Sequence, residues 1–353
     1  MKRAIKISLK FITDSKRIKI EALLDSYRAA VNFYIHSLWH IKGALDKSTL
    51  ARFQHTRLSE RYKSQALKQA LSIVISTKKS AKALGVPCSI PYFKGGACLD
   101  AKFVSIETGE HSFDLMIKLS VLKEYHRIWL PCKKTKMFNT WLEKPLAKLI
   151  QGCILQEDYI ILWIEIPDFP EKKTGKVLGV DIGANKLLSD SEGNHYGTEF
   201  KSIRNKVGRR KAGSKNKKQA RTERDQYINK VVKQLPWDKI KVLGIEELKD
   251  VKKGKKKNRN KNFRKAMAPW TYRRVIEALR RKSQENRVHL VEIEPAYTSR
   301  ICPKCGKESK DNRKGEKFLC ISCGYKGDAD YIGAQNILAR TLATLRSVVS
   351  LKL

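Results

Sequence analysis

Residues 176–183 read Lys-Val-Leu-Gly-Val-Asp-Ile-Gly, an apolar run that ends in a carboxylate and a glycine. Residues 241–247 repeat this pattern as Lys-Val-Leu-Gly-Ile-Glu-Glu. Short apolar runs of this kind are typical of strands buried in a sheet. A helical pattern at residues 269–286, a strand pattern at 289–294 and a final helical pattern at 332–345 follow. The order predicts that the C-terminal half contains buried strands with acidic side chains at their ends.

The N-terminal half has a different pattern. Residues 2–13 alternate polar and apolar side chains, which predicts a strand. Residues 15–84 repeat apolar side chains at spacings of three and four, which predicts helices with a buried stripe. Short β-like runs dominate residues 91–169, and a Pro- and Lys-containing linker follows at 167–175. The pattern predicts a β-domain whose first and second strands are separated by a helical insertion.

The charge of the chain limits its function. Its 353 residues include 74 Lys and Arg against 35 Asp and Glu, a net charge of +39. The hydrophobic content of 41% is sufficient for folded domains. So large an imbalance excludes an ordinary metabolic enzyme with small substrates and requires a polyanionic partner. Nucleic acid is the first hypothesis, and a membrane surface is the weaker one.

The sequence also predicts the compartment. No apolar stretch approaches the ~20 residues of a membrane span, and no secretory signal is visible. Four cysteines lie scattered along the chain without a spacing pattern, at Cys88, Cys98, Cys132 and Cys153. These features predict a protein of the reducing cytoplasm with no membrane partner.

Four further cysteines form a metal-binding pattern. Two Cys-x-x-Cys pairs are separated by fourteen residues, and a glycine follows each pair. The four ligands are Cys302, Cys305, Cys320 and Cys323. Four thiolates complete a tetrahedral zinc shell with no open position, so the site is structural rather than catalytic. An iron–sulfur cluster or a pair of redox disulfides is the alternative.

Three acidic residues form a second candidate site. Asp181 and Glu246 end apolar strands, and Asp330 precedes the last helix. If these carboxylates converge, they repel each other unless cations neutralise them, and two Mg²⁺ ions would do so. Such a site would hydrolyse a phosphodiester. Glu247 competes with Glu246 for this role, and Asp328 competes with Asp330.

Two basic runs are candidates for contact with nucleic acid. Residues 201–224 contain eleven Lys or Arg, and residues 249–265 contain ten. The candidate side chains are Arg209, Arg210, Lys255 and Lys256. Each run is either part of a nucleic-acid channel or a solvated, partly disordered loop.

The ordered motifs of the C-terminal half resemble the TnpB family of transposon-encoded RNA-guided nucleases, and the related miniature type V CRISPR effectors. The motifs are Val-Asp-Ile-Gly at 180–183, Ile-Glu-Glu-Leu at 245–248, Tyr-Thr-Ser-Arg-Ile-Cys-Pro-Lys-Cys-Gly at 297–306, Cys-Ile-Ser-Cys-Gly at 320–324 and Asp-Ala-Asp-Tyr-Ile-Gly-Ala-Gln-Asn-Ile at 328–337. The match covers roughly residues 176–340. The N-terminal half agrees with the family only in its layout.

The resemblance implies a multidomain α+β architecture. Its parts are an N-terminal β-barrel wedge domain (residues 1–14 and 86–170), a helical recognition domain inserted in it (15–85), a C-terminal RNase H-like (RuvC) α/β nuclease domain (175–300 and 326–353) and a zinc ribbon inserted in that domain (301–325). The family motifs place the catalytic triad on Asp181, Glu246 and Asp330. The Asn that usually stands two residues after the last Asp is Ile332 in this chain, a departure that could reduce activity.

The resemblance also implies a structured guide RNA and a double-stranded target DNA beside a short recognised motif. Arg300 and Lys304, next to the zinc site, are candidates for contact with substrate phosphates. We expect an RNA-guided, Mg²⁺-dependent DNA endonuclease from a prokaryotic or mobile-element context, acting as a monomer with its RNA or as a homodimer. A guided repressor that does not cut, or an unguided RuvC-type nuclease, remain alternatives.

Overall fold

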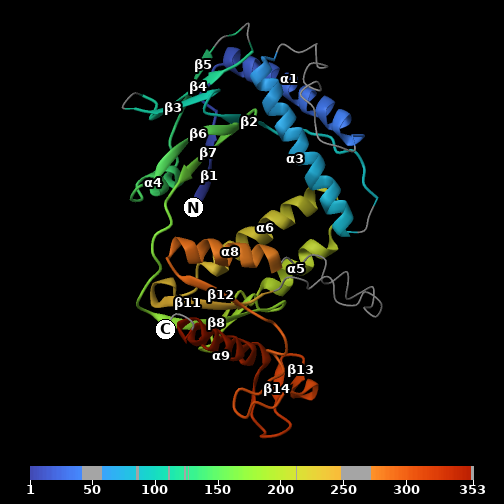
Figure 1. Ribbon diagram of the computed structural model, residues 1–353, viewed down its shortest axis with the longest axis vertical. Helices are drawn as coiled ribbons and strands as arrows, with labels where there is room; N and C mark the ends of the chain where they lie inside the picture. Colours follow the sequence, from blue (N-terminus) through green and yellow to red (C-terminus); the bar gives the residue numbers. More distant parts are fainter. Residues whose placement is uncertain are drawn as a thin grey trace. The chain divides into compact units, whose positions relative to one another are not determined.

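The computed structural model describes residues 1–41, 58–84, 87–109, 112–122, 125, 127–211, 213–247 and 272–350. The chain divides into two compact units, Met1–Pro167 and Asp168–Leu353 (Figure 1). No helix in these ranges combines the length and the hydropathy that crossing a membrane requires.

The first unit contains two antiparallel sheets. One sheet has the strand order β1-β7-β6-β2, and the other has the order β3-β4-β5. A side chain links them, because Gln151 both donates to and accepts from the backbone of Ile106. The elements are β1 (Lys2–Ser8), β2 (Ala97–Asp100), β3 (Val104–Thr108), β4 (Leu115–Ser120), β5 (Arg127–Cys132), α4 (Lys136–Leu142), β6 (Lys148–Leu155) and β7 (Tyr159–Glu165).

Two long helices lie between β1 and β2 in the sequence. They are α1 (Asp14–Trp39) and α3 (Glu60–Leu84), and they pack against each other. Tyr27 and Tyr62 meet between the helices edge to face, with ring centroids 6.4 Å apart. The apolar spacing of three and four along α1 forms its buried stripe, which includes Leu23, Leu24, Ala30 and Val31.

The second unit is built on a five-stranded mixed sheet of order β10-β9-β8-β11-β12. The strands β8 (Lys176–Ile182), β11 (Ile240–Glu246) and β12 (His289–Ile293) run parallel. The short strands β9 (Leu188–Asp190) and β10 (His195–Tyr196) extend the sheet as an antiparallel hairpin. Because β8 and β11 are parallel neighbours, their carboxyl ends lie at the same edge of the sheet.

Helices cover both faces of this sheet (Figure 1). One layer contains α5 (Phe200–Arg209), α6 (Lys215–Val232) and α8 (Tyr272–Glu285), and the other is α9 (Ala329–Ser350). A Cβ atom at Gly179 would collide with the backbone carbonyl of Ala334 in α9, and one at Gly244 would collide with Thr341. The two glycines therefore let α9 lie directly against β8 and β11.

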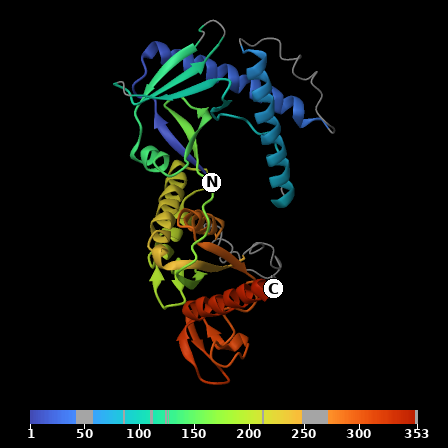
Figure 2. The same cartoon turned by 60° about the vertical axis from the view of Figure 1, so that its left-hand side comes forward.

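The basic run at residues 201–224 is mostly helical. It forms α5 and the first part of α6, so these segments are helices rather than a loop, although most of their basic side chains are exposed to solvent. The run at residues 249–265, including Lys255 and Lys256, lies outside the described residues. Between β12 and α9 the chain forms a small three-stranded sheet, β13 (Arg313–Lys314), β14 (Lys317–Leu319) and β15 (Lys326–Asp328), which carries the cysteine pairs (Figure 2).

Candidate functional site

Three carboxylates converge at one edge of the five-stranded sheet. Asp181 lies near the carboxyl end of β8, Glu246 ends β11, and Asp330 lies in the first turn of α9. All three line a pocket of about 440 Å³. Among the described residues, the lining includes a fourth carboxylate, that of Glu316 between β13 and β14, and one guanidinium, that of Arg313.

The structure shows which residue of each competing acidic pair lines the pocket. Asp328 accepts hydrogen bonds from the backbone N–H groups of Asp330 and Tyr331, at 3.0 and 3.1 Å, and so caps the start of α9. Its second oxygen pairs with Lys186 at 2.6 Å. Asp330, in contrast, lines the pocket and is 7% exposed. Glu246 lines the pocket, whereas Glu247 is absent from its lining.

The electrostatics of the pocket follow from burial and crowding. Burial and the neighbouring carboxylates of Glu246 and Asp330 raise the pKa of Asp181 to about 8. Burial also raises the pKa of Glu246 and of Asp330, while Arg313 acts in the opposite direction on each. The Arg313 guanidinium lies 3.3 Å from a carboxylate oxygen of Asp330. Lys186 also lowers the pKa of Asp330 and Arg340 that of Glu246, yet the pKa of each carboxyl stays raised, so these cations offset only part of the effect of burial.

Several lining residues were missed by sequence reasoning. Arg313 and Glu316 come from the hairpin of the small sheet, and Glu316 accepts a 2.7 Å hydrogen bond from the amide of Asn185. Tyr272, at the start of α8, donates to the backbone carbonyl of Ile182 at 3.0 Å. The sequence carries no spacing that links these residues to Asp181, because they meet only through the tertiary fold.

The turn after β12 also reaches the pocket. The hydroxyl of Thr298 donates to the carboxylate of Glu246. Ser299 lines the pocket beside it. The hydrogen bond from Thr298 favours the ionised form of Glu246 and so opposes the effect of burial on its pKa.

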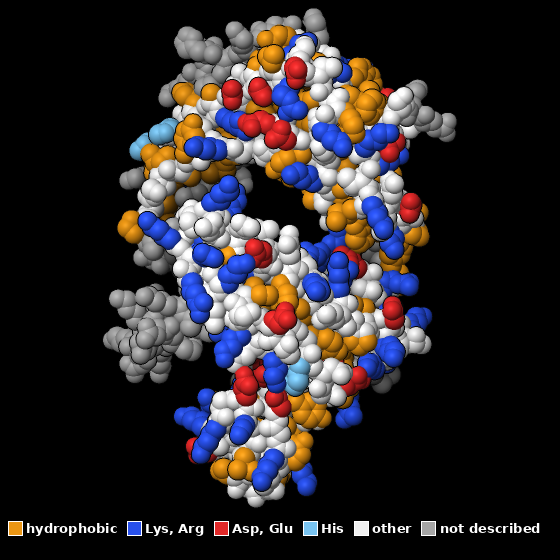
Figure 3. Space-filling view, turned by 180° about the vertical axis from the view of Figure 1, so that it is seen from behind, with side chains coloured by type: hydrophobic (Ala, Val, Ile, Leu, Met, Phe, Trp, Pro, Cys, Tyr) orange, Lys and Arg blue, Asp and Glu red, His pale blue; other side chains and the backbone are white. Residues whose placement is uncertain are grey.

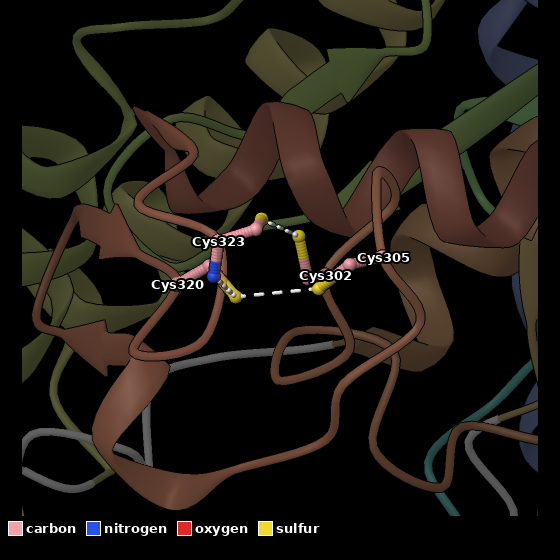
Figure 4. Close-up of side chains that lie close together, drawn as sticks. All are labelled: Cys302, Cys305, Cys320 and Cys323. Carbon is pink, nitrogen blue, oxygen red and sulfur yellow. Dashed lines mark hydrogen bonds between the residues drawn. The ribbon is translucent and has the colours of Figure 1, made fainter.

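The four cysteines of the predicted zinc site lie together (Figure 4). Their sulfur atoms all lie within 4.8 Å of one another, and the Sγ pairs Cys302–Cys323 and Cys305–Cys320 are each 3.6 Å apart. A tetrahedron with zinc–sulfur bonds of ~2.3 Å has edges of ~3.8 Å, so the arrangement fits one zinc ion. Among the described residues, these sulfurs are the one group spaced to share a single ion, whereas the carboxylates are spread around a larger pocket.

Backbone geometry supports both cysteine loops. Gly306 and Gly324 have φ angles of +76° and +68°, which glycine adopts without strain, and their N–H groups return to the carbonyls of Cys302 and Cys320. Asn312 is fully buried between the loops. Its amide donates to the carbonyls of Arg300 and Lys307, at 2.8 and 3.0 Å, and accepts from the N–H of Ile321 at 3.0 Å. Sequence reasoning did not identify this residue.

Ile332, which replaces the family's usual Asn, faces away from the carboxylates. It is fully buried in an apolar cluster with Phe318 and Ala329, against Cys302 and Cys320. Its side chain therefore packs α9 onto the cysteine-bearing sheet.

The candidate nucleic-acid contacts lie at several places. Arg209 and Arg210 are exposed at the end of α5. Arg300 is half-buried in the turn that enters the cysteine-bearing segment, and Lys304 is exposed between Cys302 and Cys305. None of these four lines the carboxylate pocket. Figure 3 shows Lys and Arg side chains spread over the surface of the second unit.

Comparison with known proteins supports the resemblance seen in the motifs. A family model described as "Cas12f1-like, TNB domain" matches residues 272–337. The CRISPR-associated endodeoxyribonuclease Cas12f1 of Sulfoacidibacillus thermotolerans is 39% identical over 69 residues, which are 19% of this chain and 16% of the relative. The putative RNA-guided DNA endonuclease InsQ of Escherichia coli K12 is 46% identical over 54 residues, which are 15% and 13% of the two chains.

A TnpB-like protein of Methanocaldococcus jannaschii, MJ0012, is 29% identical over 116 residues, 33% of this chain and 51% of the relative. The chain thus spans about half or less of the length of these curated relatives. The match to a TNB domain and to TnpB-like proteins confirms the resemblance to the TnpB family and the miniature type V CRISPR effectors.

Two solved structures share the fold over most of the chain. A cryo-EM structure of a Cas12f1–sgRNA–target DNA complex aligns with a TM-score of 0.50 and 15% identity, covering 92% of this chain and 82% of that one. The structure of the mini-RNA-guided endonuclease CRISPR-Cas_phi3 aligns with a TM-score of 0.53 and 11% identity, covering 96% and 92%. At this identity the alignments show a shared mixed α/β fold.

Proposed function

We propose that the chain is an RNA-guided endonuclease that cuts double-stranded DNA at guide-matched sites next to a short recognised motif. The observation that carries the proposal is the convergence of Asp181, Glu246 and Asp330 on one pocket. This pocket occurs in a chain similar to proteins named RNA-guided and CRISPR-associated endonucleases. The net charge of +39 suits a protein that holds a guide RNA and a target DNA together.

The architecture suits this function. We assign the five-stranded sheet and its helices to an RNase H-like (RuvC) nuclease domain, residues 175–300 and 326–353, and residues 301–325 to a zinc ribbon. The two sheets of the first unit, joined through Gln151, would form a β-barrel wedge domain, residues 1–14 and 86–170. The helices α1 and α3 would form the recognition domain, residues 15–85.

The residues of the pocket fit Mg²⁺. Its donors are carboxylate oxygens, the ligands that this ion prefers. Burial, and then the neighbouring carboxylates of Glu246 and Asp330, raise the pKa of Asp181, and a bound cation would favour its ionised form. When bound, two Mg²⁺ ions would supply an activated water and stabilise the leaving oxygen of the phosphodiester. Asp181, Glu246 and Asp330 would hold the ions. Arg313 offsets part of the remaining charge and keeps a donor group beside Asp330.

The partners follow from the same proposal. We propose a guide RNA and target DNA bound by a monomer in the prokaryotic cytoplasm, with a homodimer as the alternative. Arg209, Arg210, Arg300 and Lys304 would contact phosphates of these nucleic acids, as would Lys255 and Lys256, which lie outside the described residues.

The test begins with expression of the chain together with its flanking genomic DNA. RNA that copurifies is sequenced and used in a Mg²⁺-dependent cleavage assay on a matched plasmid library. We expect one defined RNA and guide-directed cleavage that is lost in D181A. The matched control is D238A, which removes an exposed aspartate just before β11, at the opposite end of that strand from Glu246.

Two results would replace the proposal. A defined RNA that directs binding without cleavage would indicate a guided repressor. Mixed RNA, with cleavage that ignores the guide sequence, would indicate an unguided RuvC-type nuclease.

A further inference from the structure

The turn formed by residues 297–301 joins β12 to the first cysteine pair, and the proposed function gives it no role beyond the phosphate contact of Arg300. Tyr297 has a φ of +63°, a left-handed conformation that is uncommon for a residue with a side chain. Thr298, the next residue, is only 3% exposed. A strained residue followed by a buried hydroxyl indicates that the fold holds this turn in one conformation.

Three side chains attach the turn to its surroundings. The Thr298 hydroxyl donates to Oε1 of Glu246 at the end of β11. The amide of Asn336 in α9 donates to the carbonyls of Thr298 and Ile301, at 2.7 and 2.8 Å. Asn312 of the cysteine-bearing segment donates to the carbonyl of Arg300 at 2.8 Å. Thr298 is thus held through its carbonyl by Asn336 of α9 and through its hydroxyl by Glu246 of β11, so the hydroxyl points at a carboxylate of the pocket.

The choice of acceptor by this hydroxyl is informative. Thr298 Oγ1 also lies 3.4 Å from the carbonyl of Pro295, but a hydroxyl has one proton to donate. The carboxylate is the closer and the charged acceptor, so it forms the stronger bond. Thr298 engages Oε1 of Glu246, so within the described part of the chain Oε2 can face a ligand in the pocket.

We propose that Thr298 is a positioning residue for the metal site: its hydroxyl holds one oxygen of Glu246 so that the other faces the bound cation. The inference rests on the proposed function, because it takes Glu246 as a metal ligand. A glutamate side chain loses rotamer freedom when it binds a cation, and an existing hydrogen bond removes part of that loss. Partners of this kind behind a metal ligand typically contribute 10–100-fold in metal affinity.

The test measures metal binding directly, without relying on cleavage. The full chain with its copurified RNA is titrated with Mn²⁺ as a probe for Mg²⁺, and the free ion is followed by electron paramagnetic resonance. We expect T298V, which replaces the hydroxyl with a methyl group of the same size, to weaken Mn²⁺ binding about tenfold. T298S keeps the hydroxyl and should bind like the wild type. T344V, the same change at an exposed position of α9, is the matched control.

A second comparison separates positioning from a general loss of structure. In the E246Q background, T298V should have less than a twofold further effect, because the carboxylate on which it acts is gone. A further tenfold loss would overturn the proposal, as would T298V with wild-type affinity or T298S as weak as T298V. If T298V loses its zinc, T298A removes the same hydroxyl without adding a methyl group.

The outcome also distinguishes this inference from the proposed function. Loss of Mn²⁺ binding in D181A but not in T298V would reject the role of Thr298 alone. Mn²⁺ binding that is unchanged in D181A would reject the carboxylate metal site itself.

Discussion

Two aspartates of the second unit have opposite pKa shifts. Burial and two neighbouring carboxylates raise the pKa of Asp181, so that its ionised form is poorly supported without a cation. Burial acts on Asp328 in the same direction, but hydrogen bonds from Lys186 and from backbone N–H groups outweigh it and lower its pKa. One carboxylate is therefore suited to bind a cation, and the other already has its partners.

The stability of the Mg²⁺-free protein should depend on pH through Asp181. Its pKa rises from 3.8 to about 8 on folding. Between these values the folded state binds the proton and the unfolded state does not, so stability falls as the pH rises through this window. Urea unfolding at pH 5 to 9, with zinc retained, should show this fall in the wild type and a smaller one in D181N. Identical pH dependence in the two proteins would contradict the raised pKa of Asp181. Mg²⁺ added at pH 8 should restore the free energy of unfolding that the wild type loses as the pH rises.

Restoring the family's usual asparagine should not improve this protein. Ile332 is fully buried among apolar side chains, so I332N would bury an amide with no partner. We expect a loss of about 2–4 kcal/mol, measured by thermal unfolding with zinc content followed in parallel. I332V is the control and should cost no more than about 1.5 kcal/mol. A more stable or more active I332N would show that this position serves the pocket.

At the scale of elements, the contact between α9 and the sheet decides where Asp330 lies. Gly179 and Gly244 lie on neighbouring strands and both face α9. Without Cβ atoms the strands accept the helix at close range, and the first turn of that helix carries Asp330 to the carboxyl end of β8. Packing in the middle of α9 thus positions a carboxylate at its start.

G179A should separate these elements. The added Cβ would collide with the carbonyl of Ala334, and overpacking of this kind costs about 1–3 kcal/mol. The comparison variant is G333A within α9, where helix propensity favours alanine and the new Cβ would lie in ordinary contact, 3.4 Å from the carboxyl carbon of Asp181. Denaturant unfolding should therefore rank G179A below both the wild type and G333A. Equal stability of the two variants would show that α9 can move away without cost.

The elements differ in how far the sequence could predict them. The apolar runs at 176–181 and 241–246 predict buried strands, which the structure confirms, and the acidic residues at their ends follow from the same pattern. The β-like region at 91–169 contains β6, but its pattern does not delimit this strand, because a shift in its pairing between Ile150 and Ile154 interrupts the alternation. The contribution of Arg313 to the pocket was also missed, since it depends on how the cysteine-bearing sheet lies against α9 rather than on any local spacing.

At the scale of the whole molecule, charge is the dominant property. The surplus of 39 positive charges is distributed over helices and loops rather than confined to one tail. Helices α5 and α6 fix the backbone of their basic residues, whereas a disordered run would leave the same charges without a defined place. The expected readout is therefore a strong, position-dependent response of nucleic-acid binding to salt.

Removal of defined charges should change that response. Each phosphate contact contributes about one unit to the slope of log affinity against log salt, so R209Q combined with R210Q should lower the slope for RNA binding by about 2. Filter binding of the RNA between ~50 and ~200 mM salt measures this slope. The control is K173Q with K239Q, which removes two exposed charges elsewhere in the second unit. An equal change of slope in both double variants would show that only the net charge matters.

The close approach of α9 to β8 also constrains chain length in this region. Asp330 precedes Ala334, which packs on Gly179, by about one helical turn, so the two residues lie on the same side of the helix. Each residue added to an α-helix rotates the segment before it by ~100° relative to the segment after it. A single insertion between these positions would turn the Asp330 carboxylate away from the sheet edge. An insertion after Leu345 would leave the rotation of Asp330 relative to Ala334 about the helix axis unchanged. Evolutionary variation in length should therefore be absent from this one turn and permitted at the far end of the helix.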